Sequence, residues 1–225
     1  AWNRYYDYDE LVVMMTRMRD AWPRFVSMHS LGKTWEGRDL WMLVVNNPDT
    51  GGDRTKPGFW TDANIHGNEV QGGETNMYLA WYLLENYGRV DRVTELVDRA
   101  AFYIVPTVNA DGRAAWFREP NTSSSQRAPR KPFDDDRDGL MDEDPPNDLD
   151  GDGEIGRMRK RVPLGEGDWR VDPDDPEKME RVEPGEKGDY TMLGSEGIDD
   201  DGDGQINEDG PGYYDMNRNW PSGWN

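Results

Sequence analysis

Apolar residues recur at helical spacing in three stretches of the first hundred residues. Charged residues separate the apolar positions of residues 7–21, and the spacing i, i+3, i+4, i+7 predicts an amphipathic helix there. That apolar face carries Leu11, Met14, Met15 and Met18. Methionine at such positions is typical of core filling. Helical spacing of apolar residues also predicts helices over residues 73–87 and 90–99.

Other stretches have the pattern of strands. Residues 25–31 and 39–45, separated by a turn at residues 32–37, predict a β-hairpin. The apolar runs at residues 57–65 and 101–108 predict buried strands. Strands that alternate with helices indicate an α/β sheet, whose ligands are expected at the carboxyl ends of the strands.

His66 and Glu69 follow the strand predicted at residues 57–65. If Glu69 opens the next helix, the i, i+3 spacing places the two side chains on one face, where they can bind one zinc ion. The alternative is a surface histidine and a glutamate favoured by the helix dipole. Asn109 would lie at the same edge of the sheet. His29, inside the predicted hairpin, is interpreted as structural because no further ligands stand near it.

Composition separates the chain into two parts. The formal net charge is −20 over 225 residues, and most of the acidity falls after Phe133. Such a charge disfavours nucleic acids and anionic membranes as partners. The chain has no cysteine, so disulfides and thiolate metal sites are excluded. No apolar run is long enough to span a membrane, and no signal peptide is visible.

An internal repeat defines an acidic insertion over residues 133–212. The segment at residues 134–144 recurs at residues 199–209, and residues 148–155 repeat the shared D-x-D-x-D-G core. Alternate carboxylates on a tight loop converge on one hard cation, and the glycine permits the sharp turn. The predicted calcium ligands are Asp134, Asp136, Asp138, Leu140, Asp142 and Asp144 in the first loop, Asp148, Asp150, Asp152 and Glu154 in the second, and Asp199, Asp201, Asp203, Gln205, Asn207 and Asp209 in the third.

These loops resemble the calcium loops of EF-hands, dockerins and thrombospondin type 3 repeats. They lack the glutamate of an EF-hand at position twelve, and no clear helix follows them. The alternative is a solvated acidic linker. Occupancy by structural calcium ions favours an extracellular or periplasmic location, where calcium reaches the concentrations that weak modules need. Residues 158–161 form a basic cluster, and residues 163–190 are predicted to be an irregular surface excursion.

Three motifs in order resemble the M14 family of zinc carboxypeptidases. They are His66-Gly-Asn-Glu69, Asn109-Ala-Asp-Gly and Asn217-Arg218-Asn219-Trp220. The resemblance implies an α/β fold with a mixed central sheet flanked by helices, incomplete at its C-terminal side. It describes residues 1–225 as one partial peptidase domain that contains the acidic insertion.

The resemblance also implies roles for particular residues. His66 and Glu69 would be zinc ligands, and Asn217 and Arg218 would bind the C-terminal carboxylate of a peptide, the arginine by a bidentate fork. Arg159 would polarise the scissile carbonyl, with Arg118 and Arg130 as alternatives.

The family also needs a third ligand, a histidine after the Asn217 motif, and a late glutamate as general base, and neither is in this sequence. We therefore expect the N-terminal part of a calcium-stabilised metallocarboxypeptidase that is inactive alone and acts with its remaining segment. The alternative is a non-catalytic, calcium-dependent module that self-associates on a peptidase scaffold, since an incomplete sheet exposes an edge.

Overall fold

The computed structural model describes residues 2–122, 125–212 and 214–221. The chain divides into two compact units. The core unit comprises residues 1–133 and 211–225, and the acidic unit comprises residues 134–210.

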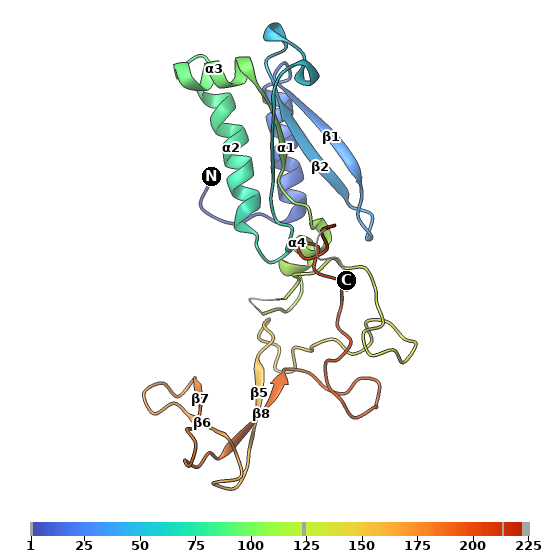
Figure 1. Ribbon diagram of the computed structural model, residues 1–225, viewed down its shortest axis with the longest axis vertical. Helices are drawn as coiled ribbons and strands as arrows, with labels where there is room; N and C mark the ends of the chain where they lie inside the picture. The colour runs from blue at the N-terminus through green and yellow to red at the C-terminus, as the bar shows by residue number, and fades with distance from the viewer. Residues whose placement is uncertain (1, 123–124, 213, 222–225) are drawn as a thin grey trace. The chain divides into compact units, whose positions relative to one another are not determined.

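The helices of the core unit begin where local capping groups allow them. Asp7 and Glu10 form a capping box at the start of the first helix, each side chain accepting a backbone N–H of the other. The helices are α1 (Tyr8–Ala21), α2 (Gln71–Asn86), α3 (Asp91–Arg99) and α4 (Ala110–Trp116), with short 3₁₀ turns at Pro48–Thr50 and Asp53–Thr55. Figure 1 shows α1 and α2 running side by side along the sheet.

A four-stranded mixed sheet forms the centre of the core unit. Its strands are β1 (Val26–Lys33), β2 (Asp39–Val45), β3 (Gly58–Asp62) and β4 (Ala101–Val105), in the order β1-β2-β4-β3. The pairs β1–β2 and β2–β4 are antiparallel, whereas β3 and β4 are parallel. The predicted hairpin and the mixed α/β sheet flanked by helices are confirmed.

The apolar faces of the helices meet the sheet in one core. Leu11, Met15 and Met18 of α1 are buried there with Met77 of α2 and Ile104 of β4. Burial of large apolar side chains is the main favourable term in folding. The helical periodicity in residues 7–21 therefore indicated the correct face.

The region after β4 differs from the prediction. The strand ends at Val105 instead of residue 108, and a helix that the sequence did not indicate follows at α4. Asn109 caps this helix by accepting the Gly112 N–H at 2.9 Å. Because α4 spans seven residues and contains a glycine, its apolar period was too short to detect.

The acidic unit contains a small antiparallel sheet that corrects a second prediction. Its strands are β5 (Arg157–Arg161), β6 (Trp169–Val171), β7 (Met179–Arg181) and β8 (Tyr190–Ser195), in the order β5-β8-β6-β7. The prediction of an irregular excursion over residues 163–190 was therefore wrong. Strands of three residues, as in β6 and β7, show no usable alternation in sequence.

Within the described residues, no helix is both long enough and apolar enough to cross a membrane.

Candidate metal sites

The first candidate site lies on the turn between β3 and α2. Asn64 adopts a left-handed conformation with φ 56°, and its Nδ2 donates to the carbonyl oxygens of His66 at 2.6 Å and Gly67 at 3.1 Å. Gly67 is required by space, because a Cβ there would lie 2.2 Å from the Gln126 carbonyl oxygen. Since α2 begins at Gln71, Glu69 lies on the turn and not in the helix.

His66 is 3% exposed, and its ring has a carboxylate at each nitrogen. Its Nδ1 lies 2.9 Å from Glu69 Oε1, and its Nε2 lies 2.9 Å from Asp215 Oδ1. A neutral imidazole carries one N–H. When Nε2 donates to Asp215, the Nδ1 lone pair faces the Glu69 oxygen, and a proton or a cation between these two atoms is needed to stabilise the contact.

This pair of donors fits zinc. Imidazole nitrogen and carboxylate oxygen are common zinc ligands, and a tetrahedral ion with bonds of roughly 2 Å needs its donors about 3.3 Å apart. The separation of 2.9 Å between His66 Nδ1 and Glu69 Oε1 is close to that requirement. In the parts of the chain that the structure describes, no second histidine joins these two donors. The other histidine, His29, lies exposed on β1 with its Nε2 2.8 Å from Ser27 Oγ.

Asp215 is a site residue that the sequence analysis missed. Burial raises the pKa of its carboxyl, but hydrogen bonds from His66, the Asn217 N–H and Arg127 outweigh that effect and lower the pKa to about 2. Asp215 is therefore ionised and fixes the orientation of the imidazole. The available signal was its place two residues before Asn217.

Arg127 is the second residue that was missed. Its Nε donates to Asp215 Oδ2 at 2.9 Å, and its Nη1 lies 3.6 Å from Glu69 Oε1. Asn109 holds this segment, since its Nδ2 donates to the carbonyl oxygens of Arg127 at 3.3 Å and Ala128 at 2.9 Å. The Asn109 motif thus both caps α4 and fixes the backbone of Arg127.

The predicted carboxylate-binding residues lie on the turn that follows Asp215. The Asn217 N–H donates to Asp215 Oδ1 at 2.8 Å, and the Trp220 Nε1–H donates to Asn217 Oδ1 at 3.2 Å. Arg218 is exposed, and its Nη1 donates to the Asn217 carbonyl oxygen at 3.1 Å. The structure therefore brings the third motif beside His66.

The arginines predicted to polarise a carbonyl have other partners. Arg159 is on β5 of the acidic unit, with its guanidinium carbon 5.3 Å from the centre of the Tyr190 ring. Arg118 pairs with Asp9 at 2.6 Å, and Arg130 pairs with Glu36 and Glu119. Among the described arginines of the core unit, Arg127 is the one that contacts Glu69.

Comparison with known proteins decides the family. A profile of the zinc carboxypeptidase family, M14, matches residues 11–143, which is more than half of the chain and includes the His66 and Asn109 motifs. The chain belongs to the zinc carboxypeptidase family.

Two relatives show how much of a longer family member this chain matches. It is 32% identical over 126 residues to carboxypeptidase D of Drosophila melanogaster, covering 55% of this chain and 9% of that protein. It is 31% identical to carboxypeptidase M of Mus musculus, covering 48% of this chain and 25% of that protein. The chain therefore spans a minor part of the length of these relatives.

Solved structures share the fold. Thrombin-activatable fibrinolysis inhibitor superposes with a TM-score of 0.53 at 23% identity, covering 62% of this chain and 33% of that chain. The bovine protein, solved with a tick carboxypeptidase inhibitor, gives a TM-score of 0.50 at 21% identity, covering 62% and 41%.

The three acidic loops have the same local geometry. In each loop the first aspartate accepts the N–H groups of the fourth and sixth residues, as Asp134 does from Arg137 at 2.6 Å and Gly139 at 3.2 Å. Asp148 and Asp199 repeat this arrangement. The sixth residue is a glycine with positive φ in every loop: Gly139 at 103°, Gly153 at 89° and Gly204 at 97°.

Each loop is also closed by one carboxylate from another segment, here called a clasp carboxylate. It accepts the N–H groups of the second and ninth residues of the loop. Asp209 accepts from Asp135 at 3.3 Å and Asp142 at 3.2 Å. Asp144 in turn accepts from Asp200 at 3.1 Å and Asn207 at 2.9 Å, so the first and third loops exchange clasps.

The second loop takes its clasp from Glu196, which the sequence analysis missed. Glu196 accepts from Leu149 at 2.8 Å and Gly156 at 2.9 Å, the second and ninth residues of that loop. Glu196 lies outside every D-x-D-x-D-G repeat. Nothing in its local sequence therefore distinguished it from other surface glutamates.

Carboxylate oxygens converge in each loop, and two of the clusters include a clasp. The groups whose oxygens lie within 4.8 Å of one another are Asp134, Asp136 and Asp209; Asp136, Asp138 and Glu143; Asp148, Asp150 and Glu196; and Asp199, Asp201 and Asp203. Some other predicted ligands have different contacts. The exposed Leu140 donates its N–H to Asp138, and the Gln205 side chain donates to Asp203 at 2.9 Å. Asn207 Nδ2 donates to the Ser195 carbonyl oxygen at 3.0 Å.

Proposed function

We propose that this chain is the N-terminal part of a metallocarboxypeptidase that removes C-terminal residues from peptides. The observation that carries the proposal is the pair formed by His66 Nδ1 and Glu69 Oε1, 2.9 Å apart, on a turn with Asp215 at the other ring nitrogen. The family implies zinc and peptide substrates.

In this proposal His66 and Glu69 hold the zinc, which when bound supplies a Lewis acid for carbonyl polarisation and water activation. Asp215 keeps the proton of His66 on Nε2, which directs the Nδ1 lone pair to the metal. Arg127 is the arginine that this geometry favours for binding a peptide carbonyl, since it lies 3.6 Å from Glu69. Arg159 stays a prediction from sequence.

Asn217 and Arg218 are proposed to bind the C-terminal carboxylate of the peptide. Arg218 is exposed and carries a planar fork of donors that matches a carboxylate. Its turn is fixed to Asp215 through the Asn217 N–H, so the carboxylate-binding residues and the metal ligands share one support.

The two histidines of the chain provide a test with a matched control. In the full-length protein, His66→Gln is expected to abolish stoichiometric zinc binding and release of C-terminal residues from peptides. His29→Gln alters an exposed ring on β1 and is expected to leave both properties unchanged. Zinc retained by His66→Gln, or a zinc-loaded protein that cleaves no peptide C-terminus, would refute the proposal.

The acidic unit is proposed to bind calcium at the three loops and to gain its stability from those ions. The converging carboxylates support this proposal, because like charges within 4.8 Å repel unless a cation lies between them. A location outside the cytosol, extracellular or periplasmic, supplies calcium at the required level. Calorimetric titration with calcium tests it: Asp150→Asn should weaken binding, whereas Asp174→Asn, outside the loops, should not.

A second candidate function is a calcium-dependent assembly module without catalysis. It is favoured by the exposed edge strand β3, where Phe59 and Trp60 are 50% and 54% exposed and Phe59 lines an apolar pocket together with Tyr78 and Tyr82 of α2. This surface suits either the remaining segment of the peptidase or a second copy. Sedimentation of the full-length protein separates the two functions, since a monomer both with and without calcium would refute the assembly module.

A further inference from the structure

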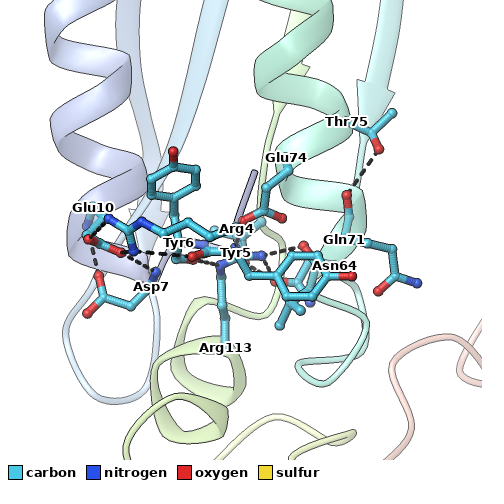
Figure 2. A network of polar contacts seen from close by, with 12 residues as sticks. Arg4, Tyr5, Tyr6, Asp7, Glu10, Asn64, Gln71, Glu74, Thr75 and Arg113 are labelled. Carbon is cyan, nitrogen blue, oxygen red and sulfur yellow. Dashed lines mark hydrogen bonds and ion pairs between the residues drawn. The ribbon is translucent and has the colours of Figure 1, made fainter. Parts of the chain in front are cut away.

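Arg113 is fully buried, although an arginine normally keeps its charged end in water. Its Nε donates to the Tyr6 carbonyl oxygen at 3.0 Å, and its Nη2 donates to the same oxygen and to Glu74 Oε1 at 2.5 Å each. Its Nη1 donates to Asn64 Oδ1 at 3.1 Å and to the Val70 carbonyl oxygen at 2.8 Å. Figure 2 shows this guanidinium between the N-terminal segment and the first turn of α2.

Asn64 connects that guanidinium to the turn that bears His66. Its Oδ1 accepts from Arg113 and from Thr107 Oγ1, while its Nδ2 donates to the His66 and Gly67 carbonyl oxygens. The side chain therefore uses all four of its hydrogen-bonding positions. Because all of these hydrogen bonds are made, the side-chain amide of Asn64, whose φ is 56°, is held in one orientation.

We propose that Arg113 is a positioning residue that, through Asn64, sets the turn on which His66 and Glu69 face each other. The inference rests on the zinc role proposed above for those two residues. One Nη1 atom bonds to both flanks of the turn, Asn64 before it and Val70 after it. His66 and Glu69 therefore lie on a turn whose two ends are bonded to the same rigid, planar guanidinium group.

A role in geometry explains the burial better than a role in stability. Removing a charge from water is costly, and a buried ion pair such as Arg113 with Glu74 is weak evidence for stability. Close packing also favours a role in geometry, because a Cβ at Gly73 would lie 2.7 Å from Arg113 Nη1. Glycine at this position lets α2 approach the guanidinium directly.

The N-terminal segment belongs to the same network. The Tyr6 N–H donates to Glu74 Oε1 at 2.8 Å, and the Tyr6 carbonyl accepts from Arg113. The segment before α1 is thus bonded to Glu74 in the first turn of α2 and to Arg113, which also bonds to the Val70 carbonyl oxygen just before that helix. The position of the metal-binding turn consequently depends on residues far from it in sequence.

The test uses Asn64→Gly in the full-length protein, because glycine adopts positive φ and removes only the bonded side chain. In the metal-free protein we expect the ¹⁵N signals of the His66 ring to move, while those of His29 stay in place. In the zinc titration, measured by competition with a chelator, we expect about a ten- to hundred-fold loss of affinity, as for other groups that orient a ligand. Arg113→Lys should show a similar loss, since an ammonium lacks the planar fork.

The matched control is Asn47→Ala. Asn47 is also buried, and its Nδ2 bonds to Tyr87 and Asp98 at another part of the core unit. We expect this variant to lower the melting temperature as Asn64→Gly does, with unchanged His66 signals and zinc affinity.

The outcomes separate this inference from the proposed function. Wild-type His66 signals in both Asn64→Gly and Arg113→Lys would overturn the inference. Signals that move in a protein whose wild type binds no zinc would support the positioning role and refute the proposed function.

Discussion

The core unit and the acidic unit are stabilised by opposite means. The core unit buries a continuous set of apolar side chains, including Leu43, Met77 and Ile104 at 0% exposure. Among the described residues of the acidic unit, Ile155 is the one apolar residue with a buried side chain. The described side chains that are fully buried in this unit are those of two aspartates, Asp144 and Asp209. Apolar burial thus holds the first unit, and carboxylate–amide hydrogen bonds hold the second.

Charged groups differ between the units in the same way. In the core unit, contacts with His66 and Arg127 outweigh burial and lower the pKa of Asp215 to about 2. In the acidic unit, burial and a neighbouring aspartate raise the pKa of Glu143 and Glu208 to about 7. Asp215 of the core unit thus has cationic partners in the protein, whereas the carboxyl groups of Glu143 and Glu208 have aspartates as neighbours.

The largest expected effect is that of removing the calcium ions proposed for the acidic loops. Without the ion, repulsion between carboxylates opens the loops, so hydrogen exchange at the Gly139, Gly153 and Gly204 amides should rise to nearly unprotected rates. Exchange in α2 and β4 should not change, because apolar packing protects them. Hydrogen exchange with and without calcium, with readdition as the control, measures this. Equal protection of the acidic unit in both states would contradict the comparison.

Truncation in the core is expected to produce the converse result. Leu11→Ala removes a side chain that is 1% exposed and should lower the free energy of unfolding of the core unit by about 2–5 kcal/mol. Calcium affinity should be unchanged. Val13→Ala, at 47% exposure on the same helix, is the control and should have little effect in denaturant unfolding. A large loss of calcium affinity in Leu11→Ala would show that the acidic unit depends on the apolar core.

A substitution of a clasp carboxylate is expected to act on the loop that it closes and not on its own. Asp144→Asn exchanges one accepting oxygen for an NH₂ group opposite the Asp200 or Asn207 N–H, at a cost of about 1–3 kcal/mol. Amide exchange should rise in the third loop. Asp209→Asn is the reciprocal control and should act at Asp135 and Asp142. Loss of protection confined to the mutated segment would contradict the exchange of clasps.

The smallest expected effect concerns Asp98 in the core unit. The hydrogen bond from Asn47 is the main reason why the pKa of Asp98 lies below its ordinary value. A carboxyl with a lowered pKa stabilises the folded state above its unfolded pKa of about 3.9, and that contribution is lost as pH falls through the folded value. Asn47→Ala should raise this pKa in a ¹³C NMR titration. Asn86→Ala, whose amide bonds to the Tyr82 carbonyl, should not.

Local spacing in the sequence determined much of the molecule. The helical period placed Leu11, Met15 and Met18 on one buried face, and the resemblance carried by three motifs identified the family that the profile match shows. The D-x-D-x-D-G spacing indicated tight loops with glycine at the turn, and positive φ at Gly139 agrees with that. These features depend on atoms a few residues apart, so the sequence alone specifies them.

The tertiary structure alone decided which distant groups complete each site. Asp215 reaches His66 across 149 residues, and Arg127 donates to Asp215 from a segment whose backbone Asn109 holds. Likewise Glu196 closes a loop some forty residues before it. A carboxylate can accept an N–H from any segment that the chain path brings near. Its partner is therefore set by packing, and no local pattern in the sequence encodes it.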